Sequence, residues 1–516
     1  MPEALFDAAT MWGLFDRRAT TSPDVPFLLD PDDRRVTFSE ARAWAERVAA
    51  GLQRLGVGAG TPVSWQLPTR METVIASLAL ARLGAVQNPI IHIYREREVG
   101  FALRQTGARL LLTPGEWRGF DYTAMARRLA DGMDDPPTVL VTYDTLPEGD
   151  PALLPAPPAD GGGIRWIYFT SGTTSDPKGV QHSDESLIAG GRGLALSMAL
   201  TPGDVGSVTF PFAHIGGPDY LVMCLACGFP ALLVEAFVPA ETPELFARYG
   251  VTMAGGSTAF YTAFLTEQRK DPTRKAYPTL RLLSGGGAPK PPEIYYEVKR
   301  ELGIPIVHGY GMTEVPMICN GSPLDSDEQL ANTEGAPVAG AEVRIVLEDG
   351  SVAPPDVVGE VRVRGPMVFK GYTDPVLDAA AFDADGYFRT GDLGLARADG
   401  HVTLTGRLKD VIIRKGENIS AREVEDLLYE HPQVAEVAVI GLPDPDRGER
   451  VCAVIEVPAG AVAPTLDELA RYLKDAGLMV QKIPEQLVVV AQLPRNATMK
   501  ILKYQLRDEL RSTPWP

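Results

Sequence analysis

The sequence predicts an α/β protein with a large N-terminal domain of two α/β sheet subdomains and a small β-rich subdomain, followed by a small α+β C-terminal domain. As far as His308, apolar β-rich runs alternate with helical patterns, which is typical of βαβ units around buried parallel sheets. From about Gly335 the runs become short and are separated by turns, and after Gly406 a compact mixture of helices and strands follows. A chain of 516 residues also exceeds what a single core usually supports, so we expect two domains, 1–408 and 409–516.

The two large sheets are expected to contain buried strands at Thr61–Leu67, Ala108–Thr113, Thr138–Tyr143, Ile164–Thr170, Val205–Phe210, Ala231–Phe237, Leu280–Leu283 and Ile304–His308. Between them, Met71–Leu83 has apolar residues at roughly helical spacing, and Pro243–Arg248 is a second helical stretch. Pro151–Gly163 is rich in Pro, Ala and Gly. It is expected to be a linker that ends where strand Ile164–Thr170 begins.

The later part of the chain predicts shorter elements. The β-rich subdomain is expected to contain strands Ala341–Leu347, Val358–Val363 and His401–Thr405. The tail is expected to contain helices Ser420–Tyr429 and Leu466–Lys474 and strands Val434–Ile440, Val451–Val457 and Leu487–Ala491. The boundary between the domains is placed near residues 407–410.

Composition narrows the possible partners and locations. Lys plus Arg number 49 against 67 Asp plus Glu, and the net charge of −18 disfavours nucleic acid as a partner. The N-terminal residues lack a basic stretch followed by an apolar core, so no secretory signal is expected and a cytoplasmic location is predicted. The most apolar long window, Tyr220–Val238, is broken by Gly228 and Pro230 and contains Glu235. It therefore indicates a buried helix and strand rather than a membrane span.

The four cysteines predict neither a zinc site nor a disulfide. Cys224 and Cys227 form a CxxC pattern without a second pair nearby, and their neighbours are mostly apolar. We interpret them as core residues of a protein in a reducing compartment.

The segment YFTSGTTSDPKGV at residues 168–180 is the most informative local pattern. It offers five hydroxyl side chains between Thr170 and Ser175, two glycines that let backbone N–H groups approach an anion, and the positive charge of Lys178. It is not a Walker-type loop, because Pro177 precedes Lys178 and Gly179 follows it. The segment indicates a polyphosphate site, and taken alone it would also suit a polar surface turn.

Five further segments accompany this loop: SGGGAP at 284–289, GYGMTE at 309–314, YFRTGDLG at 387–394, GRLKDVIIRKGENIS at 406–420 and PRNATMKILKYQLR at 494–507. Together and in this order they resemble the acyl-adenylate-forming superfamily of acyl-CoA synthetases, peptide-synthetase adenylation domains and firefly-type luciferases. The resemblance covers nearly the whole chain. It implies an ATP-dependent acyl-CoA synthetase that uses ATP, Mg²⁺ and coenzyme A.

The resemblance also assigns roles to nucleotide-binding residues. The β- and γ-phosphates would be held by Thr170, Ser171, Gly172, Thr173, Thr174 and Lys178. Thr313 would touch the α-phosphate, and Glu314 would bind magnesium, which prefers oxygen ligands. Tyr310 would lie against the adenine beside a flat slot formed by Gly286, Gly287 and Ala288. Asp392, between Gly391 and Leu393, would accept hydrogen bonds from both ribose hydroxyls through an exposed carboxylate, with Arg407 as a second ribose contact; without the resemblance, an Asp in a TGD sequence would be a plain turn residue.

Further implied residues belong to the C-terminal segments. Lys500 would be catalytic in the first half-reaction, bridging the attacking carboxylate and the α-phosphate. Met499 departs from the family pattern, which has Gly before this Lys. Lys409 falls at the hinge about which a mobile C-terminal domain would rotate, and Gly416 would line the pantetheine tunnel.

His214, in the segment FPFAHIGG, matches the position that guards the acid pocket in this family. Small or aliphatic residues around it, such as Ile215 and Gly216, predict an apolar acid rather than an amino acid, although Asp219 keeps that point open. Ser175-Asp176 and NPIIHIYREREV at 88–99 look most like synthetases acting on alicyclic or medium-chain acids.

Two alternatives remain from the sequence. The acceptor could be a carrier-protein thiol reached in trans, or molecular oxygen as in luciferases. Otherwise the chain could be a nucleotide-binding protein without ligase activity, for which Met499 is the supporting residue. Monomer and homodimer are both compatible with the sequence.

Overall fold

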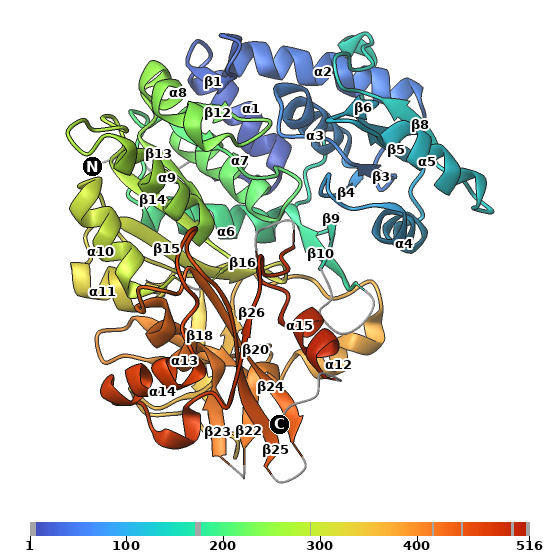
Figure 1. Ribbon diagram of the computed structural model, residues 1–516. Coiled ribbons are helices and arrows are strands. Elements are labelled where there is room, and N and C mark those ends of the chain that lie inside the picture. Colours follow the sequence, from blue (N-terminus) through green and yellow to red (C-terminus); the bar gives the residue numbers. More distant parts are fainter. Residues whose placement is uncertain are drawn as a thin grey trace.

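The computed structural model describes residues 7–170, 177–288, 290–414, 417–444, 447–496 and 500–511. Two large sheets lie together in the upper half of Figure 1, and two smaller sheets, one antiparallel and one mixed, lie below them. This arrangement confirms the predicted fold class.

The six-stranded sheet has the order β10-β9-β4-β3-β5-β8 and is parallel except for β10, which runs antiparallel to β9. Its strands are β3 (Pro62–Trp65), β4 (Val86–Pro89), β5 (Leu110–Thr113), β8 (Thr138–Val141), β9 (Ile164–Phe169) and β10 (Gly179–Ser183). The intervening segments form α2 (Phe38–Arg54), α3 (Met71–Leu83), α4 (Glu96–Thr106), α5 (Tyr122–Asp131) and the hairpin of β6 (Glu116–Trp117) and β7 (Phe120–Asp121). Every residue of α3 is buried, which explains its apolar sequence.

The nine-stranded sheet has the order β17-β16-β15-β14-β13-β11-β12-β1-β2, and its central strands are parallel. Its strands are β1 (Pro26–Leu29), β2 (Arg35–Thr37), β11 (Gly206–Val208), β12 (Ala231–Leu233), β13 (Met253–Gly256), β14 (Leu282–Gly286), β15 (Ile306–Met312), β16 (Val315–Asn320) and β17 (Ala336–Pro337). The helices of this part are α1 (Met11–Thr21), α6 (Asp184–Ser197), α7 (Gly216–Cys227), α8 (Thr242–Tyr249), α9 (Thr258–Lys270), α10 (Pro292–Glu301) and α11 (Asp327–Asn332). A single apolar core joins both large sheets.

The β-rich part is a four-stranded antiparallel sheet of β18 (Glu342–Val346), β19 (Gly359–Arg364), β20 (Phe388–Ala396) and β21 (Val402–Arg407), with the short helix α12 (Asp378–Ala381). The expectation that the Asp392 carboxylate is exposed is wrong, because the residue is 4% exposed, and it does not lie in a plain turn. The residue lies within β20 and pairs with Arg407 of β21. Pairing with β19 and β21, together with burial of Phe388 and Asp392, outweighs the turn preference of the Gly391–Asp392 pair.

The C-terminal unit contains β22 (Val411–Arg414), β23 (Glu417–Ser420), β24 (Glu436–Asp444), β25 (Gly448–Glu456) and β26 (Gln486–Val489), with α13 (Ala421–Tyr429), α14 (Leu466–Asp475) and α15 (Lys503–Leu510). Its two apolar clusters consist of residues from Ile412 onward. This separation supports, as a proposal, the boundary between residues 408 and 409, which lies in the short 3-10 turn η4 (Leu408–Asp410).

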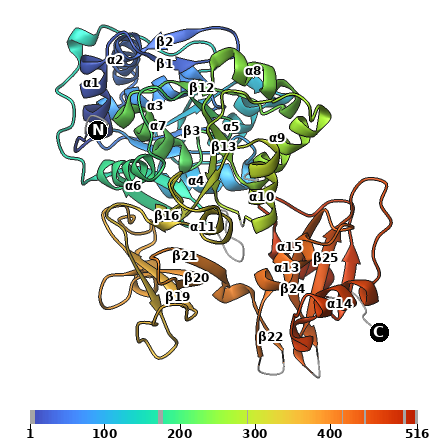
Figure 2. The same ribbon diagram turned by 90° about the vertical axis from the view of Figure 1, so that its left-hand side faces the viewer.

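The C-terminal unit lies beside the four-stranded sheet and below the large sheets (Figure 2). Arg422 of α13 forms an ion pair of 2.9 Å with Glu334, which follows α11 and is 4% exposed. Arg507 of α15 pairs with Asp410 of η4 at 2.6 Å. The Arg422–Glu334 pair joins the C-terminal unit to the large domain, whereas the Arg507–Asp410 pair ties α15 to the start of the C-terminal unit itself.

The expected strands and helices are present, with differences at their ends. The strands predicted to end at Leu283 and His308 extend further, because β14 and β15 continue into SGGGAP and GYGMTE. Cys224 and Cys227 are buried in α7 with free thiols, as predicted. Among the described residues, no helix combines the length and the apolar character that crossing a membrane requires.

Candidate active site

A cavity of about 2200 Å³ lies where the nine-stranded sheet, the four-stranded sheet and the C-terminal unit meet. The predicted site residues that line it are Thr170, Lys178, His214, Gly286, Gly287, Ala288, Tyr310, Thr313, Glu314, Asp392, Arg407, Lys409 and Lys500. The predicted residues Ser171, Gly172, Thr173, Thr174 and Gly416 lie outside the described part of the chain, as does Met499. The fold therefore brings together residues separated by more than 300 positions in the sequence.

The ends of the polyphosphate segment are joined by backbone pairing. β9 and β10 form an antiparallel hairpin in which Phe169 faces Gly179. The Thr170 N–H donates to the carbonyl of Lys178 at 3.0 Å, and the Lys178 N–H lies 3.3 Å from the Thr170 hydroxyl oxygen. A side chain at Gly179 would meet the Thr373 hydroxyl at 2.5 Å, so the glycine is required for close packing of this hairpin. Lys178 is held at the rim of the cavity.

Thr313 and Glu314 form the two-residue turn between β15 and β16. Glu314 Oε1 accepts a hydrogen bond of 2.9 Å from the Tyr372 hydroxyl, and the Thr313 carbonyl accepts one of 2.7 Å from His182 Nε2. Burial lowers the pKa of His182 to about 4, so its ring is neutral, and the carbonyl partner places the hydrogen on Nε2. His182 and Tyr372 thus fix the position of this turn through one hydrogen bond each.

Glu314 suits a magnesium ion. A carboxylate oxygen is a ligand that this ion prefers, and Tyr372 orients the group. Among the described residues, no cluster of three or more His, Cys, Asp and Glu side chains could hold a metal ion. An ion at Glu314 would therefore complete its coordination with phosphate oxygens and water, as is usual for Mg²⁺ in nucleotide sites.

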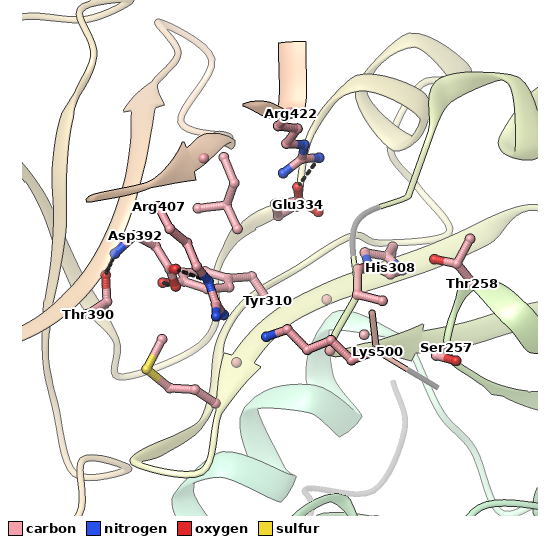
Figure 3. A pocket seen from close by; sticks show the side chains of 18 of the residues that line it. Ser257, Thr258, His308, Tyr310, Glu334, Thr390, Asp392, Arg407, Arg422 and Lys500 are labelled. Carbon is pink, nitrogen blue, oxygen red and sulfur yellow. Dashed lines mark hydrogen bonds and ion pairs between the residues drawn. The ribbon is translucent and has the colours of Figure 1, made fainter. Parts of the chain in front are cut away.

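Tyr310, Asp392 and Arg407 form a single hydrogen-bonded group (Figure 3). The Tyr310 hydroxyl donates to Asp392 Oδ2 at 2.7 Å, and Arg407 Nε lies 2.9 Å from Asp392 Oδ1. Burial raises the pKa of Tyr310 well above its usual range, which keeps this hydroxyl a donor. Because both oxygens of Asp392 already accept, a ribose hydroxyl would share their remaining lone pairs.

The glycine-rich segment after Leu283 lies between two neighbouring strands. A Cβ atom at Gly286 would lie 2.6 Å from the Gly309 carbonyl oxygen of β15, whereas one at Gly287 would meet no atom within 4 Å. Gly287 has φ +76°, and the Ala288 carbonyl accepts a hydrogen bond of 3.0 Å from His308 Nε2. The space beside Gly287 is therefore open. This open space is compatible with the flat slot predicted for Gly286, Gly287 and Ala288.

Lys500 extends toward Tyr310, Asp392 and Arg407 (Figure 3). Its backbone N–H donates to Asn496 Oδ1 at 2.9 Å. Burial first, and then the positive charge of Arg407, lower the pKa of the Lys500 ammonium to about 7. Negative substrate groups beside Lys500 would raise this pKa again, so the cavity favours anionic ligands at this point.

His214 faces the part of the cavity formed by α7 and β13. Burial lowers its pKa to about 4, so its imidazole is neutral. Gly216 N–H lies 3.3 Å from His214 Nδ1, which therefore acts as the acceptor and leaves Nε2–H as a donor. Gly255 is needed for packing here, because a Cβ atom would lie 1.7 Å from the Ser284 carbonyl oxygen.

A cavity with these groups, between a large α/β domain and a small C-terminal unit, defines the class of adenylate-forming enzymes. The chain belongs to the AMP-binding enzyme family. The profile of that family matches residues 15–373, and the profile of the AMP-binding enzyme C-terminal domain matches residues 423–500. The resemblance stated from the sequence is confirmed.

Curated relatives span nearly the whole chain. The salicyl-AMP ligase / salicyl-S-ArCP synthetase of Mycobacterium tuberculosis is 34% identical, with 98% of this chain and 90% of that protein covered. The sulfoacetate–CoA ligase of Cupriavidus necator is 31% identical, with coverages of 96% and 97%. The medium-chain fatty-acid–CoA ligase of Escherichia coli is 29% identical, with coverages of 98% and 92%.

Solved structures agree with this assignment. ATP-bound MatB from Rhodopseudomonas palustris has a TM-score of 0.88 and 28% identity, covering 97% of this chain and 99% of that one. The o-succinylbenzoate coenzyme A synthetase of Bacillus subtilis (MenE), in complex with ATP and a magnesium ion, has a TM-score of 0.84 and 29% identity, with coverages of 96% and 99%. The predicted use of ATP and Mg²⁺ agrees with these complexes.

Proposed function

We propose that this enzyme is an acid:CoA ligase that converts an apolar carboxylic acid into an acyl-adenylate and then into an acyl-CoA. The convergence of Lys178, Glu314 and Lys500 on one cavity, with the Tyr310, Asp392 and Arg407 group beside them, carries this proposal. Relatives that act as CoA ligases support the choice of acceptor.

In the first half-reaction, a carboxylate oxygen of the acid bonds to the α-phosphorus of ATP and the bond to pyrophosphate breaks. Lys500 stabilises the negative charge that accumulates between the carboxylate and the α-phosphate. Lys178 and the Thr170 hydroxyl hold the departing pyrophosphate, and Glu314 would hold Mg²⁺, which neutralises phosphate charge. Tyr310 provides a face for the adenine, and Asp392 with Arg407 orients the ribose.

In the second half-reaction, the thiolate of CoA attacks the acyl carbonyl and AMP leaves. This step does not require a separate general base, because thiols near pKa 8.5 are already partly ionised. Rotation of the C-terminal unit about Lys409 would withdraw Lys500 and bring residues 415–418 to the site. The apolar acid is supported by Ile215, Met223 and Leu194 in the cavity wall near His214.

A carrier-protein acceptor is the second candidate. It is favoured by the 34% identity to a relative named as a synthetase of salicyl-S-ArCP. Both candidates share the adenylation step and differ in the thiol that receives the acyl group.

The decisive experiment incubates the purified protein with ATP, Mg²⁺ and a panel of linear, alicyclic, aromatic and steroid-fragment acids, with and without CoA. Acid-dependent AMP release that CoA accelerates is the expected result. Adenylate that accumulates and does not respond to CoA would favour the carrier protein or oxygen as acceptor. Absence of adenylate with every acid would contradict the ligase function and would favour a nucleotide-binding protein without ligase activity.

A further inference from the structure

The wall of the acid-binding part of the cavity contains a buried carboxyl group, one oxygen of which has no hydrogen-bond partner among the described residues. Asp219 lies in the first turn of α7, lines the cavity and is 2% exposed. Its Oδ1 atom is buried and receives no hydrogen bond from any described residue. Burial raises the pKa of Asp219 well above its usual range. Burying a carboxyl group without a hydrogen-bond partner costs free energy of folding. We therefore expect a ligand to pair with it.

The absence of a side chain at Gly190 of α6 leaves space for the Asp219 carboxyl group. A Cβ atom at Gly190 of α6 would lie 3.1 Å from Asp219 Oδ1 and 3.2 Å from Pro316 Cβ. Any side chain at position 190 would therefore press on the carboxyl. Glycine and proline offer it no side-chain donor, and Asp219 lines the cavity, so a ligand in the cavity is a candidate partner.

A second acceptor lines the same cavity. Asn320 is buried at the end of β16, and its Nδ2 donates to the Ser197 hydroxyl at 3.0 Å and to the Gly321 carbonyl at 2.7 Å. These two bonds set the orientation of the amide and leave Asn320 Oδ1 without a donor among the described residues. The Asn320 oxygen is an acceptor, and a neutral Asp219 carboxyl offers both an acceptor oxygen and an O–H donor, which indicates a ligand group that can donate a hydrogen bond and also accept one.

We propose that Asp219 is a specificity-determining residue and that the acid substrate carries a hydroxyl group, on an otherwise hydrocarbon body, that donates to its carboxyl. This inference rests on the proposed function. A hydroxyl is favoured over an ammonium group because an ammonium would require an ionised Asp219, which burial disfavours. A site built to bind a hydroxyl rejects the analogue that lacks it, because its own buried group is then unpaired.

Tyr168 offers a structural explanation that the test must separate. Its hydroxyl is also buried without a partner, and the charge of Asp219 contributes to raising the pKa of Tyr168 above its usual range. A water molecule between the two groups would satisfy both and would make Asp219 part of the core. Tyr168 does not line the cavity, so Tyr168→Phe is a matched control.

The test measures acid-dependent ATP–pyrophosphate exchange by wild type, Asp219→Leu, Asp219→Asn and Tyr168→Phe. The acids are alicyclic and linear carboxylic acids, each with its positional hydroxy and amino analogues. We expect wild type to favour a hydroxy acid over its parent by about 10- to 100-fold in kcat/KM, mainly through KM. Asp219→Leu should remove this preference and raise kcat/KM for the parent acids without lowering Tm. Asp219→Asn, which keeps an acceptor and the shape of the side chain, should retain part of the preference, and Tyr168→Phe should retain all of it.

Three results would overturn the inference. Equal use of parent and hydroxy acids by wild type, with a ratio unchanged in Asp219→Leu, would show that Asp219 does not select the substrate. A parallel loss of Tm in Asp219→Leu and Tyr168→Phe would assign Asp219 to the core. If wild type preferred the amino analogue, the group that pairs with Asp219 would be an ammonium group and not a hydroxyl. If none of the acids tested supported exchange, the proposed ligase function would be contradicted, and the inference that rests on it would fail as well.

Discussion

Lys500 is the residue whose surroundings bear most directly on the reaction. Burial, and then the positive charges of Arg407 and Lys409, lower the pKa of Lys500 to about 7. The carboxylates of Asp392 and Asp410 oppose this lowering only in part. The protein thus holds an ammonium group that is poorly satisfied until anionic substrates arrive. Such a group stabilises developing charge with little reorganisation.

Replacement of Lys500 tests this role. Lys500→Ala is expected to slow acyl-adenylate formation by about 10² to 10³ because a charge that stabilises the transition state is lost. Single-turnover formation of acyl-AMP is the measurement, with ATP affinity measured separately. The reaction of preformed acyl-AMP with CoA serves as the control and should change much less. An unchanged adenylation rate would contradict the catalytic assignment.

The pH dependence follows from the lowered pKa of Lys500. The active form is the ammonium, so its fraction falls as pH rises through about 7 in the free enzyme. We expect kcat/KM for ATP in the exchange reaction to decline above this pH, because kcat/KM reports groups of the free enzyme. The decline of kcat should occur at higher pH, since bound anions raise the pKa of Lys500. Lys500→Arg does not titrate in this range and should be flat. A wild-type kcat/KM that stays constant on both sides of this pH would disprove the explanation.

Tyr372 is a positioning residue for the predicted magnesium ligand. Its hydroxyl donates to Glu314, and its ring lies 5.0 Å from Lys178 Nζ. Tyr372→Phe removes the hydrogen bond and keeps the ring, so we expect the Mg²⁺ concentration for half-maximal activity to rise about tenfold. Titration of exchange activity with Mg²⁺ measures this change. Tyr387→Phe, which loses a hydroxyl bond to Glu342 elsewhere in the molecule, is a control that should have no effect.

At the scale of elements, the glycine-rich motifs are parts of strands. β14 carries Gly285 and Gly286 between β13 and β15, where backbone atoms of both neighbours approach closely. The glycines let three strands come together beside the nucleotide site. Gly287, just beyond β14, has another role, since its positive φ turns the chain into open space.

Two substitutions separate these roles. Gly286→Ala would place Cβ 2.6 Å from the Gly309 carbonyl oxygen, so β14 and β15 must separate and Tm should fall by several degrees with loss of exchange activity. Gly287→Ala meets no atom and has a left-handed conformation, which costs about 1–2 kcal/mol. Thermal unfolding should rank Gly286→Ala as the more damaging change, and the reverse order would contradict the close approach of the strands.

At the scale of the whole molecule, the site is complete only while the C-terminal unit is in its present position. Lys500 and Arg507 belong to the end of the chain, and Asp392 and Arg407 belong to the four-stranded sheet, yet all line the same cavity. The ion pair of Arg422 with the buried Glu334 joins the C-terminal unit to the large domain. If the unit rotates between half-reactions, this pair must break.

Arg422 therefore offers a test of the domain arrangement. Arg422→Ala should lower the rate of acyl-adenylate formation about tenfold and change the reaction of acyl-AMP with CoA much less, because only the first step needs this arrangement. The two half-reactions are measured separately. Lys482→Ala removes an ion pair with Glu423 that lies within the C-terminal unit and should leave both rates unchanged. Equal losses in both half-reactions for Arg422→Ala would show that the pair stabilises the fold without favouring one arrangement.

The elements that were predicted have a local apolar pattern, whereas helices such as α2, α6 and α9 were not predicted. Met71–Leu83 was predicted with the bounds that α3 has, since its ends carry clear signals, including Gly84 in the left-handed conformation. β4 and β13 were missed because Gln87, Asn88 and the glycines of β13 weaken the strand pattern. Ser64 Oγ and Asn88 Nδ2 make buried hydrogen bonds within the six-stranded sheet, which no local pattern reveals.

By itself, the sequence determined the α/β class, the order of the motifs and the chemical types of the site residues, because these depend on neighbours in the chain and on motifs of fixed spacing. Only the tertiary structure decided that Asp392 lies in a strand and contacts Tyr310 and Arg407, and that His182 and Tyr372 support the Thr313–Glu314 turn. It also decided that Asp219 Oδ1 is buried with no hydrogen-bond partner among the described residues. Each of these properties arises from contacts between residues far apart in the chain. Burial and hydrogen-bond satisfaction are properties of the packed molecule, so they could not be predicted from local sequence.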